Sequence, residues 1–115
     1  MEHTVSYSDL KRLVENSQDL ILIDVRTGSE VARQRIPRAI HIPLDEVEAA
    51  LQMTPEGFKA KYGIQKPAAD APELVFHCQS GKRGIVAMNK AHRLGYLTTR
   101  NFPGGCNEWF ARERK

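Results

Sequence analysis

A continuous apolar run at residues 20–25, Leu-Ile-Leu-Ile-Asp-Val, constrains the fold of this chain more than any other feature. A strand with one face in water alternates apolar and polar residues, so an unbroken run predicts a strand covered on both faces. Strand-like segments alternate along the chain with helical ones. We therefore predict an α/β fold with a mostly parallel five-stranded sheet flanked by helices on both faces. The predicted strands are Thr4–Val5, Leu20–Val25, Ala39–His41, Glu73–His77 and Arg100–Phe102.

Capping residues and apolar spacing predict the helices between these strands. On the helix that follows residues 73–77, Ile85, Met88 and Ala91 recur every three residues, which predicts that they pack on the sheet. The predicted helices are Ser6 to about Glu15, Ser29–Arg33, Leu44–Leu51, Thr54–Gly63, Arg83–Leu94 and a final helix that carries Trp109.

Length and composition exclude several classes of protein. At 115 residues we predict a single domain over residues 1–115, and we expect a monomer. No apolar stretch approaches membrane-spanning length and no secretory signal is present, so we expect no membrane association and a cytosolic protein, with the mitochondrion left open. A net charge of +3 suits a small anionic substrate, whereas 7% aromatic residues argue against nucleic-acid binding. Neither the two cysteines nor the four histidines show metal-ligand spacing, so we expect no metal and no cofactor.

The segment Val75–Ile85 carries the clearest chemistry in the sequence. An apolar strand ends at Cys78, and a short loop containing Gly81 then leads into a helix. This arrangement points backbone N–H groups and the positive end of a helix dipole at one sulfur atom, and such donors stabilise a thiolate. We expect Gly81 and Gly84 to supply the positive φ that this arrangement of donors needs.

The length of the loop indicates which atom it holds. Four residues separate Cys78 from Arg83, one fewer than in the related C-x5-R loop with which protein tyrosine phosphatases enclose a phosphate. The shorter loop favours a single sulfur atom attached to the cysteine over a phosphoryl group. Ser80 can add a hydroxyl donor, and the cations Lys82 and Arg83 can neutralise an approaching oxyanion.

Three segments end at the same edge of the predicted sheet: Asp24–Arg26, the Cys78 loop and the turn Phe102–Cys106. Ligands of parallel α/β sheets bind at this carboxyl edge. We interpret Asp24 and Arg26 as an ion pair that braces the loops, to which Glu30 can add. We expect His77 to pack away from Cys78, because successive side chains of a strand point to opposite faces.

Taken in order, these motifs resemble the single-domain rhodaneses, a family of sulfurtransferases, over nearly the whole chain. The resemblance is greatest to the small animal members described as thiosulfate:glutathione sulfurtransferases, a group that includes insect proteins with heat-shock names. The segments that carry it are Leu22–Arg26, Ile36–Leu44, Cys78–Gly84 and Pro103–Gly105 followed by Trp109.

The resemblance implies a mechanism and a set of site residues. The Cys78 thiolate would take the sulfane sulfur of thiosulfate, release sulfite, and pass the sulfur from a persulfide to a thiol such as glutathione, or to cyanide in vitro. Lys82 and Arg83 would hold the thiosulfate oxygens, and Asp24 and Arg26 would support the site. The implied substrate-binding residues are Gln79, Ser80, Gly81, Lys82, Arg83 and Gly84.

The sequence departs from the family pattern just before and within the stretch Ile36–Leu44. Gln34 and Arg35 stand ahead of Ile36 where the family usually has a glycine, and Arg38 replaces the usual glycine after Pro37. We therefore expect Gln34 to adopt a left-handed conformation at a helix end, at a cost of about 1 kcal/mol.

Some alternatives stay open at this point. The chain can instead be a persulfide carrier that delivers sulfur to a protein partner, with thioredoxin as a candidate acceptor, or an enzyme related to phosphatases and arsenate reductases. Cys106 has two interpretations as well: a small residue at a helix start, or a thiol that resolves an oxidised Cys78 into a disulfide.

Overall fold

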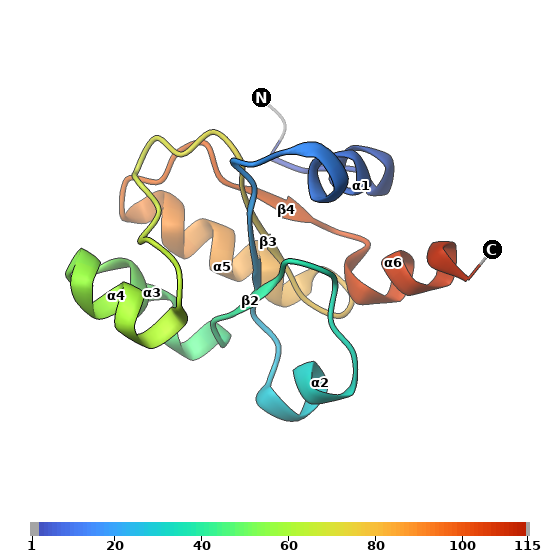
Figure 1. Ribbon diagram of the computed structural model, residues 1–115, viewed down its shortest axis with the longest axis horizontal. Helices are drawn as coiled ribbons and strands as arrows, with labels where there is room; N and C mark the ends of the chain where they lie inside the picture. Colours follow the sequence, from blue (N-terminus) through green and yellow to red (C-terminus); the bar gives the residue numbers. More distant parts are fainter. Residues whose placement is uncertain (1–2, 115) are drawn as a thin grey trace.

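The computed structural model, which describes residues 3–114, contains one sheet of four parallel strands in the order β2-β1-β3-β4 (Figure 1). β1 and β3 pair over their whole length, from Ile21 opposite Leu74 to Asp24 opposite His77. Every residue of β3 is buried, as expected for a strand covered on both faces. The strands are β1 Ile21–Asp24, β2 Ile40–His41, β3 Leu74–His77 and β4 Arg100–Phe102.

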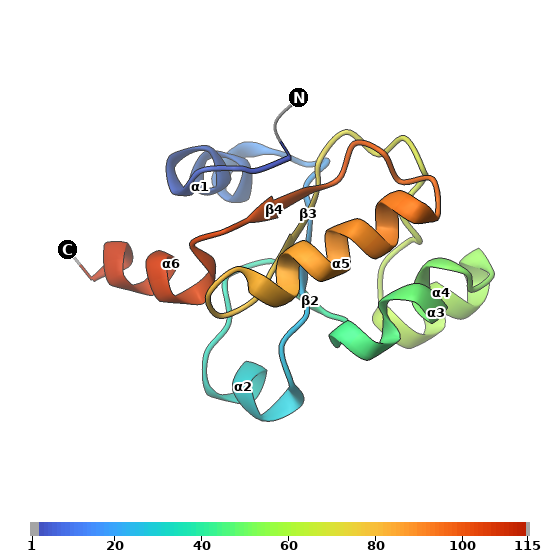
Figure 2. The same ribbon diagram turned by 180° about the vertical axis from the view of Figure 1, so that it is seen from behind.

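Helices cover both faces of the sheet, which confirms the predicted α/β architecture (Figures 1 and 2). α1 and α6 pack on one face, and α3, α4 and α5 on the other. The helices are α1 Tyr7–Asn16, α2 Gly28–Arg33, the 3₁₀ turn η1 Leu44–Glu46, α3 Val47–Leu51, α4 Pro55–Tyr62, α5 Lys82–Arg93 and α6 Gly105–Glu113. None of the helices within residues 3–114 combines the length and the apolar character needed to cross a bilayer.

Side-chain caps set where several helices begin. Ser6, Thr27 and Thr54 each accept a hydrogen bond from the backbone N–H three residues on, which satisfies one free donor of the first turn. The predicted helix Leu44–Leu51 differs from the structure, because its first turn is the 3₁₀ turn η1. No side chain caps η1, whose preceding residue is Pro43.

The prediction of five strands is wrong by one. Residues 4–5 form a single parallel bridge, Thr4 with Asn101, at the β4 edge. The backbone N–H of Val5 donates to Asn101 O at 3.0 Å. The pairing stops there because Ser6 is already the N-cap of α1, so the chain turns away from the sheet.

The buried stripe of α5 also differs from the prediction. Ile85 is 45% exposed, whereas Met88 and Ala91 are buried as expected. The buried side consists of Gly84, Ala87, Met88 and Ala91. This spacing of three and four follows the 3.6-residue helical repeat, whereas a strict three-residue repeat drifts off the buried side within two turns.

The left-handed residue near β2 is Arg38 and not Gln34. Gln34 is extended, with φ −171°, whereas Arg38 has φ 73°. The Arg38 guanidinium donates to the carbonyl oxygens of Leu13, Val14, Ser17 and Leu20 at and beyond the end of α1. The last turn of α1 has no basic residue of its own, so Arg38 supplies the cation that helix C-termini favour.

Two substitutions of Arg38 separate its two effects on stability. We expect Arg38→Ala to destabilise the protein, because it removes the bonds to these carbonyls and keeps a side chain at positive φ. Arg38→Gly loses the same bonds but relieves the backbone, so it should be about 1 kcal/mol more stable than the alanine variant. Urea denaturation measures both; equal stabilities of the two variants would show that φ 73° imposes no strain.

Candidate active site

Cys78 is the first residue after β3, and its sulfur lies inside the loop that leads to α5. The side chain is 1% exposed, and the backbone N–H of Gly81 donates to Cys78 Sγ at 2.9 Å. α5 begins at the next residue, Lys82, so the positive end of its dipole lies beside the loop. The sequence predicts several backbone donors to this sulfur, and the structure shows one of them, Gly81 N–H, at a helix N-terminus.

Two glycines let the loop approach the β4–α6 turn. Gly81 has φ +101°, and a Cβ there would lie 2.5 Å from Pro103 O. Gly105 has φ +59°, and a Cβ there would lie 2.5 Å from Gln79 O. Both positions therefore exclude side chains through conformation and space together. These contacts bring the third predicted segment, residues 102–106, against the Cys78 loop.

The other residues of the Cys78 loop differ in conformation, in hydrogen bonding and in exposure to solvent. Gly84 does not take the positive φ expected of it, because it lies within α5; a Cβ there would come within 2.1 Å of Asn101 Oδ1. The Gln79 side chain accepts a hydrogen bond from Arg26 Nη1 at 3.0 Å and donates one to Asn107 Oδ1 at 2.6 Å. Ser80 and Lys82 are exposed to solvent.

Arg83 is held in place by Glu30, from α2. Its Nη1 and Nη2 atoms donate to the two Glu30 carboxylate oxygens at 2.7 and 3.0 Å. These hydrogen bonds lower the pKa of Glu30 to about 2 and raise the pKa of Arg83, to which the Cys78 sulfur also contributes. Arg83 therefore stays charged beside Cys78, in a fixed orientation.

Sequence reasoning did not find the pairing of the Glu30 carboxylate with Arg83. Glu30 does lie beside Arg26, as expected, but Arg26 reaches its backbone oxygen, at 3.5 Å, and not its carboxylate. The spacing Thr27-x-x-Glu30 could have located it, because this is a capping box that fixes Glu30 in the first turn of α2. α2 lies directly beyond the carboxyl end of β1 (Figure 1).

Asp24 and Arg26 form the predicted ion pair, and both are buried. Arg26 Nη2 lies 2.7 Å from Asp24 Oδ2, and Arg26 Nε reaches both carboxylate oxygens at 3.0 Å. Burial by itself raises the pKa of Asp24, but the bonds from Arg26 outweigh it and the pKa lies below its usual value. Arg26 also donates to Gln34 O at 2.7 Å, so this pair connects β1, the end of α2 and the Cys78 loop.

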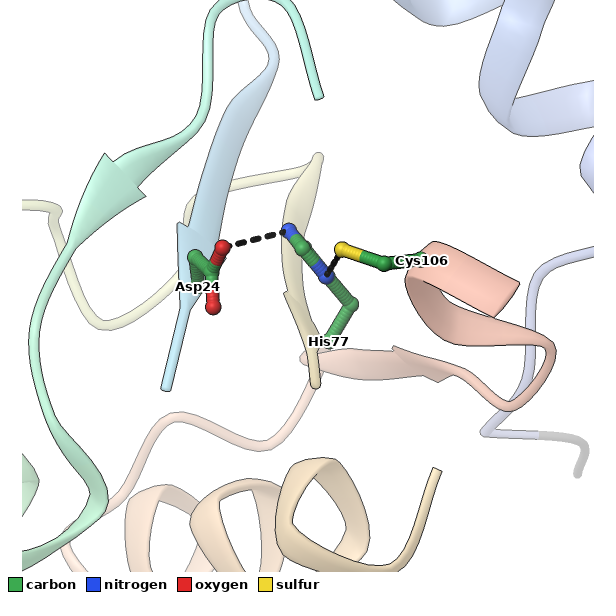
Figure 3. A group of neighbouring side chains, drawn as sticks. All are labelled: Asp24, His77 and Cys106. Atoms are coloured by element: carbon green, nitrogen blue, oxygen red, sulfur yellow. Dashed lines mark hydrogen bonds and ion pairs between the residues drawn. The ribbon is translucent and has the colours of Figure 1, made fainter. Parts of the chain in front are cut away.

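Three side chains of metal-binding types meet behind the loop: Asp24, His77 and Cys106 (Figure 3). His77 lies between the other two, with Nε2 3.9 Å from Asp24 Oδ2 and Nδ1 3.9 Å from Cys106 Sγ. Burial lowers the pKa of His77 and raises that of Cys106 to about 11, so they are a neutral imidazole and a protonated thiol. Arg26 contacts both carboxylate oxygens of Asp24, and its positive charge would repel a metal ion at this place. We therefore interpret Asp24, His77 and Cys106 as packed side chains and not as metal ligands.

The two cysteines lie on opposite faces of the sheet. Cys78 belongs to the hydrophobic cluster that contains Phe76 and α5, whereas Cys106 belongs to the cluster that contains Val75 and α6. His77 points to the Cys106 side, as predicted from strand alternation (Figure 3). The side chains of Cys78 and Cys106 therefore point in different directions, and two cysteines in that arrangement cannot form a disulfide.

We accordingly expect no disulfide between Cys78 and Cys106. After mild peroxide treatment, non-reducing peptide mass spectrometry should show oxidation of Cys78 without a linked pair. Cys106→Ala should give the same oxidation products at Cys78. A linked peptide pair in the folded wild-type protein would restore the resolving role that the sequence left open.

Two cavities flank the loop. One of about 390 Å³ is bounded by Arg83 and Val86 of α5 and by Leu44 of η1, and one of about 330 Å³ by Gln79, Arg33 and Cys106. Arg26 lines both. The edge of the sheet therefore offers a sulfur held by a backbone donor, fixed cations, and space for small molecules on either side.

Comparisons with known proteins agree with this geometry. A family described as "Rhodanese-like domain" matches residues 6–112. The chain is 44% identical to a human thiosulfate:glutathione sulfurtransferase, covering 96% of this chain and 95% of that protein. It is 39% identical to a thiosulfate:glutathione sulfurtransferase of Saccharomyces cerevisiae, covering 90% and 75% respectively. A solved human single-domain sulfurtransferase, TSTD1, superposes with a TM-score of 0.92 at 43% identity, covering 97% of this chain and 98% of that one.

Proposed function

Because the chain belongs to the family of rhodanese-like domains, we propose that it is a sulfurtransferase that moves the sulfane sulfur of thiosulfate through a Cys78 persulfide to a thiol acceptor. The observation that carries this proposal is the Cys78 sulfur, which accepts a hydrogen bond from Gly81 N–H at the start of α5. A backbone donor at this place stabilises negative charge on sulfur before and after transfer.

The first half-reaction forms one S–S bond and breaks another. The Cys78 thiolate attacks the outer sulfur of thiosulfate, and sulfite leaves with the electron pair of the broken bond. The enzyme keeps a negatively charged Cys78 persulfide, so atoms and charge balance without a cofactor. Two anions meet in this step, and the positive charges of Lys82 and Arg83 at the start of α5 reduce their repulsion.

The second half-reaction returns the enzyme to its starting state. The thiolate of an acceptor attacks the outer sulfur of the persulfide, and Cys78 leaves as a thiolate. The sum of both halves converts thiosulfate and a thiol into sulfite and a persulfide of that thiol. We propose glutathione as the acceptor, supported by the names of the human and yeast relatives.

The other site residues act through position. Gln79 fixes the start of the loop between Arg26 and Asn107, and Gly81 donates to the sulfur. Asp24 and Arg26 brace the loop from β1, and exposed Ser80 is available to a bound oxyanion. We also propose that the protein acts as a monomer in the cytosol, with thioredoxin as an alternative acceptor.

The intact mass of the protein after thiosulfate treatment tests this function. We expect a gain of one sulfur atom per chain together with release of one sulfite, both blocked by prior alkylation of Cys78. Glutathione should then remove the added sulfur. Glutathione and thioredoxin are then added to separate samples of the persulfide. Discharge by glutathione indicates an enzyme that uses a small thiol, whereas discharge by thioredoxin alone indicates a carrier that delivers sulfur to a protein. Absence of the mass gain would refute the proposed function.

A further inference from the structure

The cavity of about 390 Å³ is larger than the sulfur donor needs. Thiosulfate has five heavy atoms, whereas cavities of several hundred cubic ångströms accommodate molecules of the size of a drug or a short peptide. This cavity lies between the end of β1, η1 and the first three turns of α5, and it is open to solvent. The sulfur-transfer reaction has a second substrate, the acceptor, which needs its own binding place.

Arg83 connects this cavity to the reacting sulfur. It lines the cavity, and it stands two residues after Gly81, whose backbone N–H donates to Cys78 Sγ at 2.9 Å. A molecule in the cavity therefore lies next to the group that neutralises the persulfide.

The cavity wall along α5 has a regular chemical pattern. Arg83, Val86 and Lys90 are three and then four residues apart, so they lie on one face of the helix, with an apolar side chain between two cations. Val86 is 44% exposed, which leaves its apolar surface available. Lys90 Nζ lies 3.0 Å from Glu48, in an exposed pair of the kind that contributes little to stability.

The wall of the cavity opposite α5 carries a negative charge. Asp45 is exposed and stands beside Leu44 in η1, and both line the cavity. The walls together present three cations, because Arg26 lines the cavity as well, with apolar surface and one carboxylate. This set complements a peptide thiol that carries carboxylates at its ends and one ammonium group.

We propose that this cavity binds the sulfur acceptor and selects a small peptide thiol, with Lys90 binding a carboxylate, Asp45 the ammonium group, and Val86 and Leu44 contacting the peptide backbone. The inference rests on the proposed sulfur transfer and names the acceptor site for it. Lys90 here acts on acceptor binding and has no part in the chemistry of the donor.

The test measures the two half-reactions separately in Lys90→Glu. Persulfide formation from thiosulfate should stay within about twofold of the wild type. The concentration of glutathione needed for half-maximal discharge of the persulfide should rise by about tenfold, because a charge-assisted contact becomes a repulsion. Discharge by 2-mercaptoethanol, which has no charged group, should change by less than about twofold. Lys90→Gln should show a smaller loss with glutathione only.

A matched control and the opposing outcomes complete the experiment. Lys59→Glu makes the same change on α4, outside this cavity. It should leave persulfide formation and the discharge by glutathione and by 2-mercaptoethanol unchanged. Equal losses with glutathione and 2-mercaptoethanol, or no loss with glutathione, would overturn the acceptor site. Failure of the wild-type protein to form a persulfide would instead refute the sulfurtransferase function itself, so the two failures are distinguishable.

Discussion

Cys78→Ser should reduce sulfite release from thiosulfate to the uncatalysed background, a loss of more than about a thousandfold. The serine oxygen cannot form a persulfide, and a hydroxyl stays protonated where a thiol ionises. Serine is close to cysteine in size, so the buried position next to Gly81 should keep its packing. The measurement is sulfite release under saturating thiosulfate, paired with the intact mass of the treated protein, which should show no added sulfur.

Cys106→Ser is the matched control for this prediction. It makes the same chemical change in a cysteine that is equally buried, 1% exposed, but on the other face of the sheet. We expect it to keep sulfite release and the mass gain at near wild-type levels. Catalytic sulfite release by a folded Cys78→Ser protein would show that another group accepts the sulfur, and the first candidate would then be Cys106.

The features of the fold and site that could be predicted are determined by residues close together in the sequence. The burial of β1 and β3 follows from continuous apolar runs, and the position of the Cys78 sulfur follows from a strand, a glycine and a helix start within six residues. The shared edge of Asp24, Cys78 and Cys106 follows from parallel topology alone. These features need no knowledge of contacts between distant segments.

The features that could not be predicted depend on such contacts. Glu30 and Arg83 are 53 residues apart, and either could equally pair with other charges at the same edge of the sheet. The positive φ of Arg38 is held by carbonyl oxygens of residues 13–20, which a local reading of residues 34–39 does not include. Ile85 has the apolarity of a core residue, and only the direction in which α5 lies on the sheet decides that it faces solvent.

Glu30→Gln should reduce kcat/KM for thiosulfate by about tenfold to a hundredfold, and at neutral pH it should lose only the stability that the charged carboxylate adds. Glutamine can replace glutamate in a capping box, so α2 keeps its start at Thr27. It cannot hold both Nη atoms of Arg83 with two charged oxygens, so the guanidinium beside Cys78 loses its fixed orientation. Misplacement of a group by about 1 Å is enough for a loss of this size.

Double-mutant kinetics show whether Glu30 acts through Arg83. If it does, the combination of Glu30→Gln with Arg83→Gln should be no slower than Arg83→Gln alone, whereas independent roles would give multiplied losses. Glu113→Gln is the matched control, because it removes a carboxylate that pairs with Lys11 on the other side of the sheet, and it should leave kcat/KM unchanged. Wild-type kinetics in Glu30→Gln would show that Arg83 does not need this partner.

The pH dependence of stability gives an independent readout of the same pair. Folding lowers the pKa of Glu30 to about 2, chiefly through the hydrogen bonds from Arg83. The ionised carboxylate therefore adds stability that is fully present above the unfolded-state pKa, about 4.3, and is lost as the pH falls from there towards 2. Between pH 5 and pH 2.5 the wild type should thus lose more stability than Glu30→Gln, measured as urea midpoints at each pH. Parallel curves for the two proteins would mean that Arg83 and Glu30 are not paired in solution, and the orientation of Arg83 beside Cys78 would then need another cause.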